Sequence, residues 1–463
     1  MDAPRSLWLQ EALRLEEGGD APELVESIEA DVCIVGGGYT GLWAALRVKE
    51  LEPDASVVLI DADICGGGPS GRNGGFALSW WPKVETLQKR FGKDAHRLVK
   101  ISEDAIAEIG SFCEREGVDA HFHRGGWLWT ATSPAQVGSW ESSLEIADSY
   151  GEHPFELLSA EEVQARTGSP VHFGAAFEAS AATVQPALLA RGLRRVALGR
   201  GVRIHERTPM VELDREEGVV RTPSGSIRAG AIVLALNAWA SRIKELSRAL
   251  VAVSSDIVAT APMSDALQES GWTGGESISN CRLMVHYYRT TRDGRVVFGQ
   301  GGARHAFSGR VDSKFDFNGT QTESLKKDLV RLVPAAAGVP VTNAWGGPID
   351  RTADGLPFAG RLPGRVPIVY GTGYSGNGVA PSFTFARILA SSALGRGDEW
   401  SELPLNRGVG STFPPEPVRF VGGLVVRRAV RRKEGREDRG LTCDPVTGAV
   451  AGLAPQGFFR VKR

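Results

Sequence analysis

Short apolar runs alternate with helix-like segments along much of this chain. Residues 31–35 and 57–60 are apolar runs, and residues 42–51 between them have helical spacing. Strand, helix and strand in this order are typical of a βαβ unit. Apolar runs recur at residues 231–236 and 366–370, and the second is followed by another helical stretch. The pattern predicts a fold of the mixed α/β class.

A second group of segments has a different pattern. Residues 126–130, 256–261, 283–289 and 295–299 alternate in polarity or carry β-branched side chains, whereas residues 99–116 have the spacing and charge of a helix. Alternation is typical of strands with one buried face. We expect these strands to form a mostly antiparallel sheet, separate from the βαβ unit.

Glycines mark the turn between the first apolar run and its helix. Gly36, Gly38 and Gly41 form G-x-G-x-x-G, and Asp61 closes the second run 20 residues after Gly41. The first glycine allows a tight turn, the second lets a pyrophosphate approach the backbone, and the third lets helix and strand pack closely. The helix N-terminus offers free N–H groups to phosphates, and the carboxylate can accept ribose hydroxyls. The spacing therefore predicts a dinucleotide site.

A second glycine loop indicates which dinucleotide is bound. Ser70-Gly71-Arg72-Asn73-Gly74-Gly75 begins nine residues beyond Asp61, where a nicotinamide enzyme needs no such loop. NADP is further disfavoured, because Asp61 and Asp63 would repel a 2′-phosphate. The loop favours a flavin.

With this loop the chain resembles the FAD-dependent D-amino-acid oxidase and glycine oxidase superfamily. The resemblance is greatest to gamma-glutamylputrescine oxidase-like amine oxidases, which carry a near-identical S-G-R-N-G-G. Further similar segments are residues 183–186, 231–239, 352–360 and 371–378. The family usually has glutamate where this chain has Asp61, a shorter carboxylate with the same expected role.

The resemblance implies FAD as a non-covalent cofactor and assigns its contacts. No cysteine lies in residues 310–380, and no histidine comes directly after the second loop. Neither of the covalent links to FAD that relatives use is therefore expected. The implied FAD-binding residues are Gly36, Gly38, Tyr39, Thr40, Gly41, Asp61, Ala62, Ser70, Gly71, Arg72, Asn73, Gly74, Val211, Asn237, Gly373, Tyr374, Ser375, Gly376, Asn377 and Gly378.

The resemblance also implies a fold of the α/β (α+β) class with two interleaved domains. A discontinuous Rossmann-like FAD-binding domain is expected from residues 28–85, 180–250 and 340–398. A substrate domain on a mostly antiparallel sheet is expected from residues 86–179 and 251–339. Residues 399–463 would form a basic C-terminal extension.

Family chemistry implies oxidation of a C–N bond in an amine or amino acid. Hydride passes to flavin N5, the resulting imine hydrolyses, and oxygen is the expected electron acceptor. Three alternatives stay open: a dehydrogenase with another acceptor, a specialised biosynthetic amine or N–N oxidation, and a flavoprotein whose FAD is structural. No lysine lies in residues 280–310, where several relatives place the lysine that activates oxygen.

The substrate contacts are expected on strands that face the flavin. One cluster of candidates consists of His286, Tyr287, Tyr288 and Arg289, and a second of Arg304 and His305. Tyr288 and His286 are the candidates to frame an amine, and Arg72 could hold a carboxylate or brace its own loop. Because strand side chains alternate, only half of each run can face one pocket. Core packing is the alternative interpretation of Tyr288 and His286.

Composition narrows the partners. A net charge of −2 argues against nucleic acid as a partner. The sequence contains no run of 18 apolar residues, so no membrane span is predicted. The five scattered cysteines and the lone pair His121 and His123 indicate neither a disulfide framework nor a metal site. Residues 1–30 lack a signal pattern, so a cytoplasmic protein is expected. The sequence does not determine the oligomeric state, and a homo-oligomer is one of the alternatives.

The C-terminal segment has a composition of its own. Residues 418–439 hold eight lysines and arginines against three acids, with apolar residues between them. A basic amphipathic helix can bind a membrane surface or a polyanion, but docking on the flavin domain or a neighbouring subunit is favoured. Gly422 and Gly423 are expected to weaken any long regular helix there.

Overall fold

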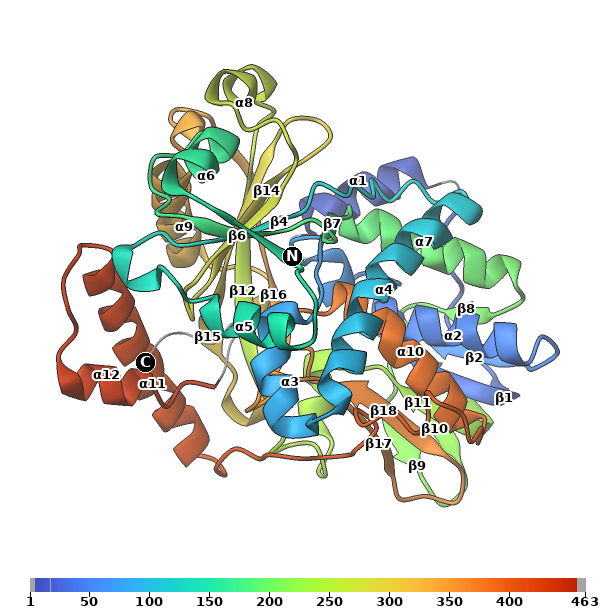
Figure 1. Ribbon diagram of the computed structural model, residues 1–463. Helices are drawn as coiled ribbons and strands as arrows, with labels where there is room; N and C mark the ends of the chain where they lie inside the picture. Colours follow the sequence, from blue (N-terminus) through green and yellow to red (C-terminus); the bar gives the residue numbers. More distant parts are fainter. Residues whose placement is uncertain (1–4, 17, 456–463) are drawn as a thin grey trace.

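The computed structural model describes residues 5–16 and 18–455, and it contains two large sheets (Figure 1). The first sheet runs in the order β17-β18-β11-β1-β2-β8, with a small β9–β10 extension on β11. Its strands are β1 (Ser27–Val35), β2 (Val57–Ile60), β8 (Arg203–His205), β9 (Glu212–Asp214), β10 (Val219–Arg221), β11 (Ser226–Leu234), β17 (Phe358–Leu362) and β18 (Ile368–Thr372).

The centre of this sheet is parallel and buried. β1 pairs in parallel with β11 and β2, and β18 and β8 extend the parallel sheet on either side. Val57–Ile60 is buried at every position, as expected for a strand with both faces covered. One face is covered by α2 (Tyr39–Leu51), α4 (Asp94–Arg115), α7 (Pro186–Gly199) and α10 (Val379–Ala393). Residues 240–250 pack on the other face.

The second sheet is mostly antiparallel, in the order β16-β12-β15-β14-β13-β4-β6-β5. Only β4 and β13 pair in parallel among the strands that the structure describes in this sheet. The strands are β4 (Trp127–Thr130), β5 (Phe155–Leu158), β6 (Ala175–Glu178), β12 (Val251–Thr260), β13 (Ser277–Asn280), β14 (His286–Thr290), β15 (Val296–His305) and β16 (Val341–Arg351). α6 (Ala160–Thr167), α8 (Ser264–Ser270) and α9 (Gly319–Leu332) cover one face. The predicted fold class is confirmed, whereas the residue limits of the two domains stay a prediction.

Shorter elements connect the sheets. β3 (Phe76–Ala77) pairs with β7 (Ala182–Thr183), and α3 (Val84–Phe91) and α5 (Glu141–Ser149) pack beside α4. α1 (Leu7–Leu15) begins at Ser6, whose Oγ accepts from the Leu9 N–H. Trp8 of α1 joins Trp345 of β16 in a small apolar cluster.

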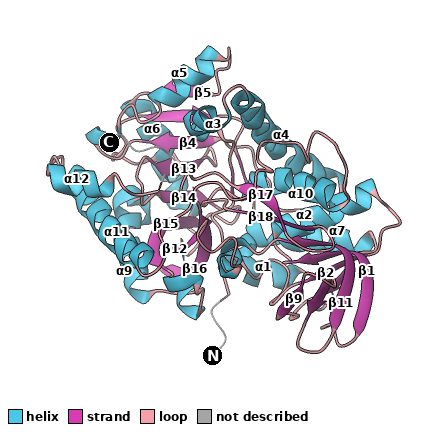
Figure 2. Cartoon of the chain, turned by 90° about the horizontal axis from the view of Figure 1, so that it is seen from below, coloured by secondary structure: helices cyan, strands magenta, loops and turns pink. Residues whose placement is uncertain are grey.

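The C-terminal extension forms α11 (Val418–Glu437) and α12 (Pro445–Ala451). Figure 2 shows both helices beside the strand group that contains β12 and β15. The extension packs on the second sheet. Arg419, near the start of α11, also donates to the Ser247 and Leu250 carbonyls, in the 180–250 segment predicted for the flavin domain. The expected docking on that domain therefore accounts for part of the contacts. Despite Gly422 and Gly423, α11 is one unbroken helix. A Cβ at Gly423 would lie 2.9 Å from the His305 ring, so close packing favours glycine here.

Among the described residues, no helix is long and apolar enough to span a bilayer. The same residues contain no cluster of three histidine, cysteine or acidic side chains suited to a metal ion. All five cysteines are free thiols, and four of them are buried.

Candidate active site

The first glycine loop lies at the carboxyl end of β1, where α2 begins. Gly36 has a φ of +117°, and a Cβ there would lie 2.4 Å from the Ala235 carbonyl oxygen. A Cβ at Gly41 would lie 1.9 Å from the Gly36 oxygen, so this crossing admits only glycine. Gly38 caps α2 without a side-chain hydrogen bond, which leaves the helix N-terminus suited to phosphate.

Asp61 follows β2 and faces this loop. Its Oδ2 accepts from the Gly37 N–H at 2.6 Å, and its Oδ1 accepts from the Asp63 N–H at 2.7 Å. Burial raises the pKa of Asp61 to about 6. Asp63 pairs with Arg5 at 2.6 Å, so a guanidinium does reach this end of the site, from a position that sequence spacing could not indicate.

The segment after β8 lies beside Asp61 and contains Val211, one of the predicted FAD contacts. The Thr208 N–H donates to the Asp61 carbonyl at 2.7 Å. Val211, the predicted contact, bonds through its N–H to the Arg221 carbonyl, and its side chain is 63% exposed. The structure therefore brings Thr208 against Asp61, whereas Val211 pairs with Arg221 of β10, and the FAD contact of Val211 stays a prediction.

The second glycine loop is tied down by aromatic side chains. The carbonyls of residues 71, 72 and 73 accept from Ser6 Oγ, Trp345 Nε1 and Trp8 Nε1 at 2.5, 2.8 and 2.9 Å. Ser70 Oγ accepts from the Tyr39 N–H at 2.9 Å, which joins this loop to the start of α2. The two loops and α1 therefore form one connected unit.

Arg72 stabilises that unit through contacts of its Nε and Nη1. Its Nε donates to the Gly67 carbonyl at 2.8 Å. Its Nη1 lies 2.5 Å from Asp316 Oδ1 and 3.3 Å from the Gly346 carbonyl. These contacts favour the bracing interpretation of Arg72 over a substrate role.

The third loop, residues 373–378, connects β18 to α10. Asp350 Oδ2 accepts from Thr372 Oγ1 at 2.9 Å and from the Gly373 N–H at 2.5 Å, and burial raises the pKa of Asp350 to about 6. Tyr374 Oη lies 2.7 Å from Thr40 Oγ1, so this loop also meets the start of α2. Three segments far apart in the sequence thus converge on the N-terminal end of one helix.

Buried acceptor atoms around the third loop lack protein donors. Asn237 Oδ1, Asp350 Oδ1 and Asn377 Oδ1 have no hydrogen-bond partner among the described residues. Asn237 lies beside Asp350 through Thr372, whose Oγ1 also contacts the Asn237 carbonyl at 3.3 Å. Buried polar atoms are rarely left unpaired, so a ligand with donors is indicated. A flavin nucleotide offers its N3–H and ribityl hydroxyls, and the residues present fit that group.

Strand alternation separates the candidate substrate residues. Tyr287 on β14 faces the second glycine loop, where its ring contacts Phe76 and its Oη lies 2.6 Å from Ser255 Oγ. Arg289, on the same face, donates to the Val184 carbonyl at 2.8 Å, and burial lowers its pKa to about 10.

The predicted pair lies on the opposite face. His286 lies 3.3 Å from Asp328 of α9, and Tyr288 packs against Trp272 with its Oη 3.2 Å from His172 Nε2. The structure therefore does not bring Tyr288 or His286 to the glycine loops. Alternation showed that half of the run faces the site but could not tell which half.

Lys83 is a buried base that sequence reasoning missed. Its Nζ donates to the Gly355 carbonyl at 2.6 Å, and burial, together with Arg351, lowers its pKa to about 7. Asn377 Nδ2 donates to the Ser79 carbonyl at 3.4 Å, which ties this segment to the third loop. Relatives place their lysine in the region of residues 280–310, whereas Lys83 lies on the segment after β3, eight residues beyond Gly75.

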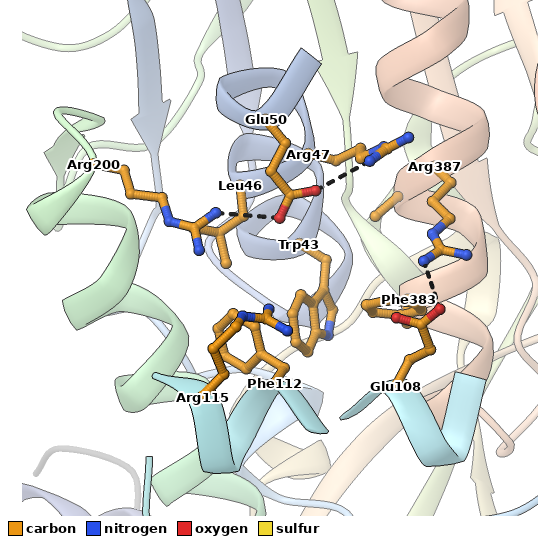
Figure 3. Close-up of a pocket in the computed structure, with 11 residues that line it drawn as sticks. Trp43, Leu46, Arg47, Glu50, Glu108, Phe112, Arg115, Arg200, Phe383 and Arg387 are labelled. Atoms are coloured by element: carbon orange, nitrogen blue, oxygen red, sulfur yellow. Dashed lines mark hydrogen bonds and ion pairs between the residues drawn. The ribbon is translucent and has the colours of Figure 1, made fainter. Parts of the chain in front are cut away.

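A cavity of about 350 Å³ lies elsewhere, among the outer ends of α2, α4 and α10 (Figure 3). The Trp43 ring packs against Phe112 and Phe383 in its lining. Among its charged residues, Arg47 and Arg200 pair with Glu50, and Arg387 pairs with Glu108. It lies at the far half of α2 from the glycine loops, so it is not part of the candidate active site.

Comparisons with known proteins agree with this geometry. A family model described as FAD dependent oxidoreductase matches residues 31–392. The chain belongs to this family. The oxidoreductase is 30% identical to the gamma-glutamylputrescine oxidoreductase of Escherichia coli, over 82% of this chain and 88% of that protein. It is 25% identical to the glycine oxidase of Bacillus subtilis, over 75% of this chain and 89% of that protein.

Solved structures show the same fold. The glycine oxidase of Geobacillus kaustophilus superposes with a TM-score of 0.68 at 20% identity, covering 82% of this oxidoreductase and all of that chain. Every predicted loop of the cofactor site lies within the 31–392 match, whereas α11 and α12 lie beyond it. FAD is the cofactor of the family, and the residue-by-residue contacts remain predictions.

Proposed function

We propose that this oxidoreductase oxidises the C–N bond of a small amine or amino acid and passes the electrons to oxygen. The observation that carries the proposal is the convergence of the loops at residues 36–41, 70–75 and 373–378 on the start of α2. The proteins it resembles are named for oxidising gamma-glutamylputrescine and glycine, which supports an amine substrate. Bound FAD would accept a hydride from the carbon beside the nitrogen, and water would hydrolyse the resulting imine.

The chain's own residues hold and orient the reactants in this proposal. Asp61 would accept the ribose hydroxyls, the N-terminus of α2 would face the pyrophosphate, and the third loop would face the pyrimidine edge. The remaining predicted FAD contacts, including Val211, keep the roles given above. Arg72 serves as a positioning residue that fixes the second loop.

The substrate would lie on the face of the second sheet that carries Tyr287. The Tyr287 and Ser255 hydroxyls form a pair on this face, beside the second glycine loop. His286 would not contact the substrate, because its side chain lies on the face turned toward α9. There its Nε2 lies 2.9 Å from Gln300 Nε2. Tyr287 is therefore the residue we assign to framing the amine.

Oxygen as the acceptor has one structural support. Lys83 places a buried amine near Arg351 and near Asp350, the carboxylate that holds the third loop. With a pKa of about 7 this amine is partly charged near neutral pH, and a positive charge near a flavin favours its reaction with oxygen. A dehydrogenase with another acceptor remains the second candidate.

Anaerobic titration of the purified yellow protein tests the proposal. The panel should include gamma-glutamylputrescine, putrescine, glycine, sarcosine and several D- and L-amino acids, with flavin absorbance as the readout. Bleaching by one class would identify the substrate, and admitting air would show whether oxygen restores the colour. FAD bound at full occupancy with no bleaching by any compound would contradict the proposal and favour a specialised substrate or a structural flavin.

A matched pair of variants tests the assignment of the sheet face. Tyr287→Phe is expected to slow bleaching or raise the amine concentration it requires by tenfold or more, because one hydroxyl is lost beside the loop. Tyr288→Phe, which removes the neighbouring hydroxyl from the far face, is expected to leave the bleaching rate within twofold. Equal effects of both variants would contradict the assignment.

A further inference from the structure

A cavity outside the candidate active site lies between β15, the start of α9, and α11. Its volume is about 370 Å³. It is lined by Ala303, Arg304, His305, Asn318, Thr320, Gln321, Leu424, Arg427 and Arg431. Because α11 begins beyond residue 392, where the family match ends, this cavity depends on the chain's own extension.

The lining is strongly basic. It contains three arginines and no carboxylate. Burial lowers the pKa of Arg427, and the neighbouring charges of Arg431 and Arg304 lower it further, so the three guanidinium groups are close enough to repel one another. His305 adds no charge at neutral pH, because burial and Arg427 lower its pKa to about 4.

The donors in this cavity are incompletely paired by protein. Arg427 Nη1 donates to the Ala303 carbonyl. The Nε of Arg304 is buried without a partner among the described residues. Asp256 on β12 attracts Arg304, but this carboxyl does not line the cavity. Like charges held close together beside a buried donor that has no protein partner indicate a site suited to an anion.

The N-terminus of α9 adds to this field. The helix has 14 residues, and its N-cap residue Asn318 accepts from the Gln321 N–H through its side chain. Asn318, Thr320 and Gln321 all line the cavity, so the positive end of the helix dipole faces the same space as the arginines. Two independent sources of positive potential therefore converge on one open hollow of the surface.

We propose that this cavity binds a small multivalent anion, a phosphate or a di- or tricarboxylate. Planar guanidinium groups form paired hydrogen bonds with either group, and the volume suits a ligand of that size. Leu424 is the one large apolar side chain of the lining, which favours a compact polar ligand over an extended apolar one. The site does not depend on the amine substrate proposed above.

Isothermal titration of the FAD-loaded protein with inorganic phosphate and with citrate, in 150 mM NaCl, tests the proposal. Saturable binding of at least one probe is expected. Arg431→Gln and Arg304→Gln should each weaken it by tenfold or more, since each removes a charge-assisted contact. Arg428→Gln is the matched control, because Arg428 is exposed on the same helix but does not line the cavity.

Hydrogen exchange keeps the test independent of enzyme activity. The bound anion should slow exchange in residues 319–323 and 424–431 of the wild-type protein and of Arg428→Gln, but not of Arg431→Gln. Binding by phosphate alone or citrate alone would assign the ligand class. No saturable binding of either probe, or equal binding by Arg431→Gln and Arg428→Gln, would overturn the proposal.

Discussion

Asp61 couples cofactor binding to pH. Burial holds its pKa at about 6 in the protein without ligand, against 3.8 for a free aspartate. Ribose hydroxyls donate to the charged carboxylate, so bound FAD should lower this pKa. Below about pH 6 a proton must then leave before FAD binds, and FAD affinity should fall by up to tenfold per pH unit.

Fluorescence titration of FAD between pH 5 and pH 8 checks this expectation. Asp61→Asn should bind FAD about tenfold more weakly at pH 8, because it loses a charge-assisted acceptor. Its affinity should also depend less on pH, although Asp350, whose pKa is also raised to about 6, leaves a residual dependence. A wild-type pH profile in Asp61→Asn would show that this carboxyl does not meet the ribose.

Lys83 should make stability rise with pH. Burial lowers its pKa to about 7 from 10.5, so between these values the unfolded chain binds more protons than the folded one. The contribution of Lys83 to the free energy of unfolding should therefore increase by up to about 1.4 kcal/mol per pH unit from pH 7 toward pH 10.

The comparison with Lys83→Met isolates this effect. Chemical unfolding of both proteins at pH 7, 8 and 9 should show a steeper rise for the wild type. The difference in slope is the relevant quantity, because the variant also leaves the Gly355 carbonyl without its donor. Parallel slopes would mean that the amine keeps its charge when buried.

At the scale of elements, α1 holds the second glycine loop in place, and we call this helix the strap. Trp8 Nε1 donates to the Asn73 carbonyl and its ring packs against Trp345. Trp8→Phe keeps most of the packing but leaves that carbonyl unpaired, at a cost of about 1–3 kcal/mol. We expect faster FAD release and a lower unfolding temperature.

Leu15→Ala is the control for the strap, because Leu15 is 69% exposed at the end of the same helix. It should change FAD release less than twofold. Release measured by flavin fluorescence during dilution distinguishes the two variants, and similar release rates would show that α1 does not hold the loop.

The sequence predicted those parts of the site that local spacing determines. Gly36 and Gly41 were identifiable because a tight crossing of β1 and α2 admits no side chain, and the second loop carried its own motif. The strap could not be predicted, because Trp8 and Trp345 are far apart in the sequence and any buried tryptophan gives the same signal. The sequence also left open which face of β14 is turned toward the site, because the alternating pattern is compatible with either face.

At the scale of the whole molecule, the same limit appears in the C-terminal extension. Composition indicated a basic helix but not its docking surface, since that depends on Glu434. This buried carboxylate accepts from the Leu283 N–H at 2.7 Å and pairs with Arg282 at 3.2 Å, beyond the second sheet's β13. Tertiary contacts, including His305 against Gly423, override the low helix propensity of two glycines.

Glu434 should therefore decide whether the extension stays docked. Glu434→Ala leaves the Arg282 guanidinium, which is 9% exposed, with only Asp438 as its partner at 2.8 Å among the contacts of α11. Removing one member of a buried ion pair typically costs about 3–5 kcal/mol. Hydrogen exchange should increase across residues 418–451 and 281–285, while the glycine loops keep their protection, because their hydrogen bonds are made with α1, α2, β16 and one another and not with α11. Glu437→Ala removes a pair made with Lys433 inside the same helix, and it should change exchange little. If protection of α11 were the same in both variants, the docking would rest on apolar packing around Met284 and Val430 and not on this charge.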